Sequence, residues 1–184
     1  MQFELEFDTS HLTYVLRAAR GEIEHPEGML DSIGFTLLQQ NRKRHDAGLD
    51  PNGQPWKPLS PLTLQATDPK TKQPIKRKSQ QPLLRSGEML KALHKDVNGD
   101  ELRVFFWGNV EAERARYHQF GTKPRVITPR NSPVLAFAGI VTKRVNHPGL
   151  PKRELIGFPD SDRDLVENVA TDHLQRVLQQ ARAK

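Results

Sequence analysis

The feature that most constrains the fold of this chain is a proline-rich stretch from Gly48 to Pro82. These 35 residues hold seven of the fourteen prolines in the 184-residue sequence. Proline has no backbone N–H and its ring clashes with the preceding helical turn, so the stretch can form neither a long helix nor a central strand. Structureless loops beyond about 12–15 residues are uncommon in compact domains and are usually functional or disordered. We therefore interpret residues 48–82 as an extended arm.

The two halves of this arm differ in composition. The first half contains Trp56, Leu59, Leu62 and Leu64, apolar side chains that an inert linker does not need. We predict that this half docks on the domain and that residues 68–81 are the mobile portion. The whole arm has five lysines and one arginine against two aspartates, which accounts for +4 of the chain's net charge of +6. This excess favours nucleic acid or an acidic protein surface as a partner.

The length of the chain predicts one domain, residues 1–184, with the arm at 48–82 within it. A globular chain of this length has a radius of gyration of roughly 16 Å, and hence a diameter near ~40 Å. A hairpin-like excursion over the arm reaches about 55 Å, at ~3.3 Å per residue for half its length. The arm can thus extend past its own domain and contact a neighbouring subunit.

The spacing of apolar residues predicts both helices and strands. Helices are expected from Thr9 or Ser10 to Gly21, from Pro26 to Arg44, from an N-cap at Ser86 through Leu93, from Ala112 to Gln119, and from the capping group at 160–162 to Ala181. Strands are expected at 3–7, 101–107, 126–128, 134–137 and 140–145, with turns at 98–99 and 138–139. The 101–107 strand is apolar on both faces, which is typical of a central strand. The predicted fold class is α+β, with several helices packed on a small antiparallel sheet, the extended arm and a β-hairpin.

The sequence lacks the residue groups that catalysis requires. It has no cysteine, its seven histidines are scattered without metal-ligand spacing, and it contains no phosphate-binding loop or nucleophile motif. We therefore predict that the protein is not an enzyme and holds no cofactor or metal. No run approaches the ~20 consecutive apolar residues of a membrane helix, and the first residues lack the pattern of a secretory signal. We expect no membrane contact and a protein that remains in the cytoplasm where it is made.

Four segments, taken in order, resemble a known family. They are residues 50–59 (DPNGQPWKPL), 83–90 (LLRSGEML), 117–121 (YHQFG) and 150–157 (LPKRELIG). Together they are similar to the phage virion morphogenesis family, the tail completion proteins of Mu-like and related long-tailed phages. Leu155 stands where this family usually has phenylalanine, and Arg114 occupies the usual position of a tyrosine. The segment from Thr128 to His147 resembles more closely a neighbouring family of head-to-tail joining proteins.

The resemblance implies a structural virion protein that forms a homo-oligomeric ring, which we expect to have six copies. The ring would act as a tail completion or terminator protein at the head-proximal end of the tail, or would lie in the neck, where the tail joins the head. The implied partners are other copies of the chain, the tail tube protein and the head–tail connector proteins, with contact to DNA in the channel left open. The candidate interface residues are Trp56, Leu59, Leu62, Lys70, Lys72, Lys76, Arg77, Lys78 and Arg153. Two alternatives stay open: Trp56 as an anchor within its own chain, and Arg153 paired with a nearby carboxylate.

A second interpretation rests on charge. A basic nucleic-acid-binding protein would use the arm at residues 68–81 to neutralise phosphates without sequence preference. Against this interpretation, the basic part of the arm has no interleaved aromatic side chains on which bases could stack. A hydrolase or nuclease is disfavoured because the chain lacks an acidic cluster for magnesium. Oligomers that form without nucleic acid would favour the ring over the nucleic-acid-binding protein.

Overall fold

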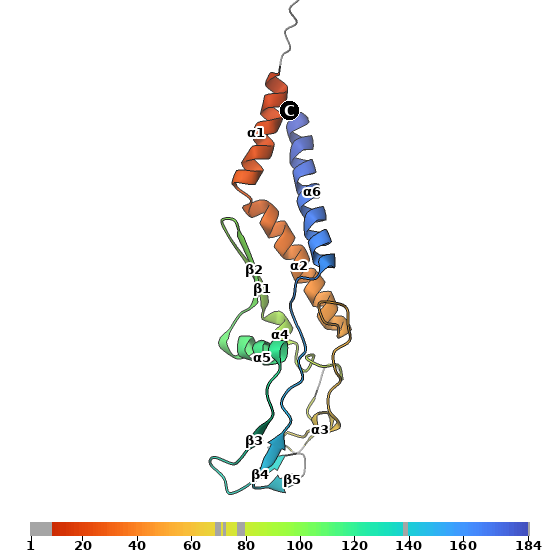
Figure 1. Cartoon of the computed structure of the whole chain (residues 1–184), viewed down its shortest axis with the longest axis vertical. Helices are drawn as coiled ribbons and strands as arrows, with labels where there is room; N and C mark the ends of the chain where they lie inside the picture. The colour runs from red at the N-terminus through yellow and green to blue at the C-terminus, as the bar shows by residue number, and fades with distance from the viewer. Residues whose placement is uncertain (1–8, 69–70, 72, 77–79, 138–139, 184) are drawn as a thin grey trace, which may run out of the picture. The chain divides into compact units, whose positions relative to one another are not determined.

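The computed structural model describes residues 9–68, 71, 73–76, 80–137 and 140–183 (Figure 1). The chain divides into two compact units. Unit 1 comprises residues 1–38, 95–104 and 158–184, and unit 2 comprises residues 39–94 and 105–157. Each unit is therefore assembled from segments that are far apart in the sequence. The strand predicted at 3–7 and the turn predicted at 138–139 lie outside the described residues.

The described residues form six helices and six strands (Figure 1). The helices are α1 (Ser10–Glu24), α2 (Glu27–Ala47), α3 (Pro61–Leu64), α4 (Glu88–Lys91), α5 (Asn109–Phe120) and α6 (Asp160–Arg182). The strands are β1 (Leu93–Asn98), β2 (Glu101–Phe106), β3 (Arg125–Ile127), β4 (Leu135–Phe137), β5 (Ile140–Thr142) and β6 (Val145–His147). The fold is thus a mixed α+β fold, as predicted. In place of the predicted single sheet, these strands form three separate antiparallel pairs, β1–β2, β3–β6 and β4–β5.

Unit 1 contains two helices that lie side by side, α1 and α6 (Figure 1). Val15 of α1 and Ala181 of α6 are buried, and the carboxylate of Glu22 lies 2.8 Å from Nε2 of His173. Both helices confirm the prediction from apolar residues at helical spacing. The predicted capping group at 160–162 is corrected, because Pro159 is the N-cap of α6 and makes no side-chain cap. Asp160 and Asp162 instead lie in the first turn of α6, where the helix dipole favours negative charge.

The first part of α2 packs within unit 1 against the β1–β2 hairpin. Gly34 faces this hairpin so closely that a Cβ atom there would lie 2.6 Å from Cδ1 of Leu102. The ammonium group of Lys95 forms an ion pair with the carboxylate of Asp31. The turn that joins β1 to β2 contains Gly99, whose φ of 60° suits the tight turn predicted there.

The prediction between residues 86 and 107 is wrong in two respects. The third helix is a single turn, α4, with Gly87 as its N-cap, and Leu93 is the buried first residue of β1. Pairing with β2 through the tight turn overrides the local helical pattern of these residues. Among the described residues the 101–107 strand pairs with β1 alone, and Trp107 beyond it is 67% exposed, so this strand is not central there.

Unit 2 has a small core of buried side chains drawn from distant parts of the chain. Trp56, Met89, Ala115 and Leu155 form this core, and Leu83 and Phe106 pack against it. Two short antiparallel pairs complete the unit. In β3–β6, Arg125 pairs with His147, and in β4–β5, Leu135 pairs with Thr142. The strand predicted at 140–145 is thus divided between two sheets, β5 and β6, because residues 143–144 turn the chain between them.

Candidate assembly interface

The first of the four sequence segments forms a tight loop that presents Trp56. Oδ1 of Asp50 accepts hydrogen bonds from the backbone N–H groups of Asn52 and Gln54, both at 2.9 Å. Gly53 lies in this loop at a φ of 78°, a conformation that glycine adopts without steric cost. The Trp56 backbone N–H then donates to the carbonyl oxygen of Gly48 at 2.9 Å. The aspartate, the glycine and the tryptophan of the segment are therefore all parts of one loop, whereas Leu62 and Leu64, which were predicted to dock with it, are exposed.

Trp56 and Arg153 join the base of the arm to the last of the four segments. The indole Nε1–H of Trp56 donates to the carbonyl oxygen of Glu154 at 2.8 Å. The Arg153 guanidinium donates to the carbonyl oxygens of Lys57 and Pro58, at 2.8 and 3.0 Å. The Trp56 and Arg153 side chains are only 7% and 5% exposed. The arm is thus held at its base by main-chain acceptors rather than by an ion pair between side chains.

Gln119 connects the third segment to the last one. Its Oε1 accepts from the backbone N–H groups of Leu155 and Ile156, at 2.7 and 3.2 Å, and its Nε2 donates to the carbonyl oxygen of Ile156 at 2.8 Å. A side-chain amide offers both an acceptor and donors, so it satisfies backbone groups that no neighbouring strand pairs. The Arg153 N–H adds a bond to the carbonyl oxygen of His118 at 2.8 Å. Gln119→Glu would lose the donated bond, and Gln119→Leu would lose both the donated and the accepted bonds.

Two histidines lie against these residues. The ring of His45 packs edge-on against Trp56 with centroids 5.2 Å apart, and neither of its ring nitrogens has a hydrogen-bond partner among the described residues. Burial lowers the pKa of His45 below its ordinary value, partly opposed by Asp46. Burial also lowers the pKa of His118, and the positive charge of Arg153 lowers it further. Both rings are therefore neutral at pH 7.

We expect unit 2 to lose stability in mild acid. In the unfolded chain both histidines titrate near 6.5, so below about that pH the unfolded state binds more protons than the folded one. The stability that comes from keeping these two histidines neutral is fully present above that pH. It is lost as the pH falls toward the lowered pKa values of the folded state. The urea midpoint, followed by tryptophan fluorescence, should be lower at pH 5.5 than at 7.5. This difference should shrink in the double variant His45→Gln/His118→Gln and persist in the exposed control His25→Gln, and equal midpoints in the native protein would contradict the prediction.

The candidate interface residues separate into three groups. Trp56 and Arg153 are buried within their own chain, and their contact with another subunit stays a prediction. Leu59 is half-buried, whereas Leu62, at 53% exposure, and Lys76 are exposed. Lys70, Lys72, Arg77 and Lys78 lie outside the described residues. Trp56 anchors the arm within its own chain, and Arg153 binds carbonyl oxygens rather than the nearby carboxylate predicted as one alternative.

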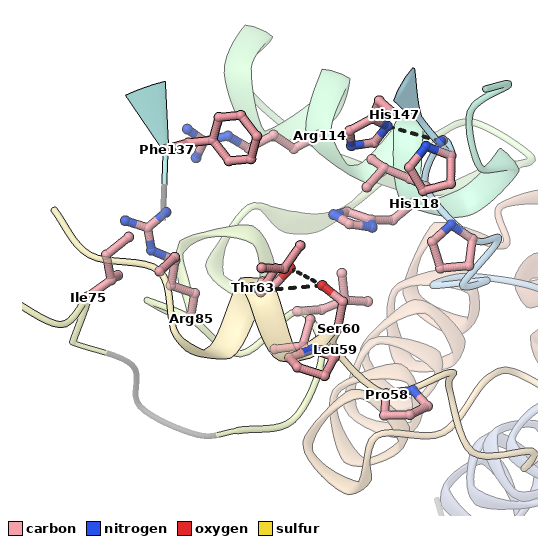
Figure 2. A pocket seen from close by; sticks show the side chains of 18 of the residues that line it. Pro58, Leu59, Ser60, Thr63, Ile75, Arg85, Arg114, His118, Phe137 and His147 are labelled. Atoms are coloured by element: carbon pink, nitrogen blue, oxygen red, sulfur yellow. Dashed lines mark hydrogen bonds between the residues drawn. The ribbon is translucent and has the colours of Figure 1, made fainter. Parts of the chain in front are cut away.

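An open cleft of about 1920 Å³ lies beside this junction within unit 2. Figure 2 shows Ser60 and Thr63 on one side of it and Arg114, His118 and His147 on the other. Further lining comes from Phe137, Ile140 and Val141 of the β4–β5 pair. Small-molecule pockets have volumes of roughly 300–1,000 Å³. The cleft is therefore large enough for a segment of polypeptide.

Many large apolar side chains stay exposed in the described part of the chain. Ten hydrophobic residues are buried there, whereas sixteen large ones are exposed. The exposed ones are Leu12, Tyr14, Leu16, Ile23, Phe35, Leu62, Leu64, Trp107, Val110, Tyr117, Phe120, Val126, Phe137, Ile140, Val141 and Phe158. Exposed apolar patches mark surfaces that bind other proteins. Leu62 is the one member of this set that the sequence predicted as an interface residue, and several others, such as Leu12, Leu16 and Trp107, lie in segments whose spacing suggested a buried face.

Comparison with known protein families gave a match over most of the chain. The family model of the phage virion morphogenesis family matches residues 7–175, which include parts of both units. The chain belongs to the phage virion morphogenesis family. The resemblance found in the four segments is thereby confirmed, and this virion morphogenesis protein has a role in phage structure and assembly. No curated protein sequence and no solved structure matches the chain.

The described residues of the virion morphogenesis protein hold no group of three or more histidine or acidic side chains placed to bind a metal ion. Within the same residues, no helix is both long and apolar enough to cross a bilayer. The family is one of structural and assembly proteins. The buried junction accordingly has the character of a scaffold.

Proposed function

We propose that this virion morphogenesis protein forms a closed ring of six identical subunits at the head-proximal end of the phage tail or at the head–tail joint. The observation that carries the proposal is the excess of exposed over buried large apolar side chains in the described residues. The three two-stranded sheets support it, since an isolated strand pair is marginally stable in water and its edges can pair with another chain. Closed rings of identical subunits bury such surfaces symmetrically.

Mass photometry at micromolar concentration tests the ring directly. We expect a single oligomer of six subunits, either with the protein alone or after addition of the tail tube protein. Electron microscopy of the particles should show a ring with an open channel. A strict monomer under both conditions would contradict the proposal.

We further propose that the arm, residues 48–82, binds a neighbouring subunit or tail protein. At its base, the arm is tied to unit 2 through Trp56. Farther out, the described backbone bonds stay within the arm: the Asp68 N–H donates to the Gln73 carbonyl oxygen at 2.8 Å, and the Ile75 N–H donates to the Ala66 carbonyl oxygen at 3.1 Å. A segment that bonds mainly to itself adds little to the stability of the unit that carries it.

Replacing residues 70–80 with a short Gly/Ser linker is therefore expected to leave the melting temperature almost unchanged. The same replacement should weaken ring formation or docking to the tail, because basic side chains speed encounter with an acidic surface and fix its orientation. Raised salt should have the same effect in the native protein, since exposed charges are screened beyond about 8 Å at physiological ionic strength. A matched control keeps the segment and changes only Lys70, Lys72, Lys76 and Lys78 to glutamine. A large drop in melting temperature on replacement would instead make the arm part of the core fold.

Nucleic-acid binding by the arm at residues 68–81 is the second candidate function, favoured by its five basic side chains. Phosphate neutralisation would make the affinity for DNA fall steeply with salt. Titration of the protein with duplex and single-stranded DNA separates the two functions. If the Gly/Ser replacement abolishes DNA binding while assembly survives, nucleic-acid binding takes precedence over docking to a protein.

A further inference from the structure

The β-rich part of unit 2 has an uneven charge. From Gly121 to Arg153 the chain has seven basic side chains and no aspartate or glutamate: Lys123, Arg125, Arg130, Lys143, Arg144, Lys152 and Arg153. Lys152 pairs with Glu154, Arg153 binds carbonyl oxygens, and the other five are exposed. Arg85 is also exposed and lines the cleft. Arg114 also lines the cleft and pairs there with Glu111, the one acidic residue among the described lining residues, whereas the five exposed basic residues lie in the same β-rich region outside that lining. A partner that binds in the cleft and reaches these residues should therefore carry negative charge.

The same region also exposes apolar side chains. Phe137, Ile140 and Val141 are 41%, 42% and 68% exposed, and all three line the cleft. They belong to the β4–β5 pair, which has three residues in each strand and no third strand among the described residues. Exposed apolar edge strands readily accept another strand. DNA phosphates would pair with the basic side chains but leave these apolar ones uncovered, so an acidic and apolar polypeptide fits the surface better.

The chain itself contains a segment with this composition, outside the described residues. Residues 2–8 read QFELEFD, in which Phe3, Leu5 and Phe7 alternate with Glu4 and Glu6 and are followed by an aspartate. Such alternation predicts a strand with one apolar face and one acidic face. Fully extended, seven residues span about 23 Å at ~3.3 Å per residue. Most of this segment precedes residue 7, where the family match begins.

We propose that residues 2–8 of one subunit bind in the cleft of a neighbouring copy as a strand added beside the β4–β5 pair. Phe3, Leu5 and Phe7 would cover the apolar wall, while the three carboxylates face the basic side chains around it. In this mode of recognition, main-chain hydrogen bonds supply affinity and alternate side chains supply specificity. The inference rests on the proposed function, because the donor strand must come from a second copy.

A peptide-binding experiment tests the cleft without requiring a ring. A fluorescent peptide of residues 1–8 is titrated with the protein lacking residues 2–8, and binding is read from anisotropy. We expect saturable binding that weakens as salt rises. Val141→Glu in the protein should weaken it at least about tenfold, whereas Val126→Glu, on an exposed valine that does not line the cleft, should not. A peptide carrying E4K and E6K should also bind at least about tenfold more weakly, and this change cannot disturb the fold of the protein.

A mixing experiment tests exchange between subunits. The protein lacking residues 2–8 keeps the cleft but has no strand to donate. The full-length Val141→Glu variant keeps the donor strand, but its cleft is blocked. At concentrations where each is monomeric alone, the mixture should form 1:1 heterodimers. If the mixture stays monomeric although the peptide binds, the strand binds within its own subunit and the exchange is wrong.

Two further results would overturn the inference. The first is absence of peptide binding together with normal rings of the truncated protein, which leaves the proposed ring intact. The second is tight DNA binding by the truncated protein, unchanged by Val141→Glu, with no peptide binding, which assigns the surface to phosphates. A full-length protein that stays monomeric at every concentration would instead refute the proposed ring, while the peptide titration would still report on the cleft.

Discussion

Trp56→Ala is expected to lower the free energy of unfolding of unit 2 by about 3–5 kcal/mol, the usual cost of truncating a buried aromatic side chain. Trp56 is 7% exposed and packs in the core with Met89, Ala115 and Leu155. The substitution also leaves the carbonyl oxygen of Glu154 without its indole donor. Urea unfolding of the variant can be followed through the fluorescence of Trp107, which belongs to the same unit.

Two further variants separate packing from hydrogen bonding. Trp107→Ala removes the same type of side chain from an exposed position, 67% exposed, and should cost less than about 0.5 kcal/mol. Trp56→Phe keeps most of the ring but loses the N–H donor, which should cost about 1–3 kcal/mol for the unpaired carbonyl oxygen. If Trp56→Ala unfolds at the same urea concentration as the native protein, Trp56 does not anchor the arm.

Gly149→Ala is expected to be as damaging, for a different reason. Gly149 has a φ of 87°, and a Cβ atom there would overlap the carbonyl oxygen of Thr122 and lie 3.0 Å from its carbonyl carbon. These are backbone atoms, so relief requires one chain segment to move away from the other. The movement would break the pairing in which the Thr122 N–H donates to the Leu150 carbonyl oxygen at 3.0 Å. We expect a loss of about 3 kcal/mol or more, at the upper end of the usual range for single substitutions.

Gly53→Ala, in the same unit, is the matched control for this substitution. Gly53 also has a positive φ, 78°, but no atom outside its chain neighbours lies within 4 Å of the Cβ position there. Both variants carry the backbone penalty of about 1–2 kcal/mol for a left-handed alanine, and only Gly149→Ala adds the overlap. Denaturant midpoints of the two variants give the difference directly. Equal midpoints would show that the two segments are not closely paired in solution.

Local patterns predicted the long helices well and the short strands poorly. The apolar spacing of α1, α2 and α6 persists over several turns, so the pattern favours a helix clearly over a strand. Leu93 shows the opposite case. It continues the helical spacing of Met89 and Leu90, yet its segment pairs with β2, and no local signal carries that long-range preference. The three separate sheets were missed for the same reason, because strand partners are chosen by tertiary contacts.

The candidate site was only partly accessible from sequence. The motif resemblance selected Trp56, Gln119 and Arg153, but not what they bind, because all three bond to main-chain atoms that any residue would provide. A carbonyl acceptor leaves no trace in composition or spacing. The basic character of the region beside the cleft could have been suspected from one signal: the run from Gly121 to Arg153 has seven basic residues and no acidic one.

The way the arm is held at both ends has a consequence for how this protein can evolve. Trp56 at the start of the arm and Leu83 just beyond its end contact the same core cluster, and Arg153 grips two carbonyl oxygens of the arm. Because Arg153 binds main-chain carbonyl oxygens, these bonds do not depend on the side chains at positions 57 and 58. Each doubling of the length of the arm between its two fixed ends costs only about 0.6 kcal/mol in loop entropy. Insertions, deletions and substitutions can accumulate between residues 58 and 82 under selection for a new neighbour, while the scaffold that folds the subunit stays unchanged.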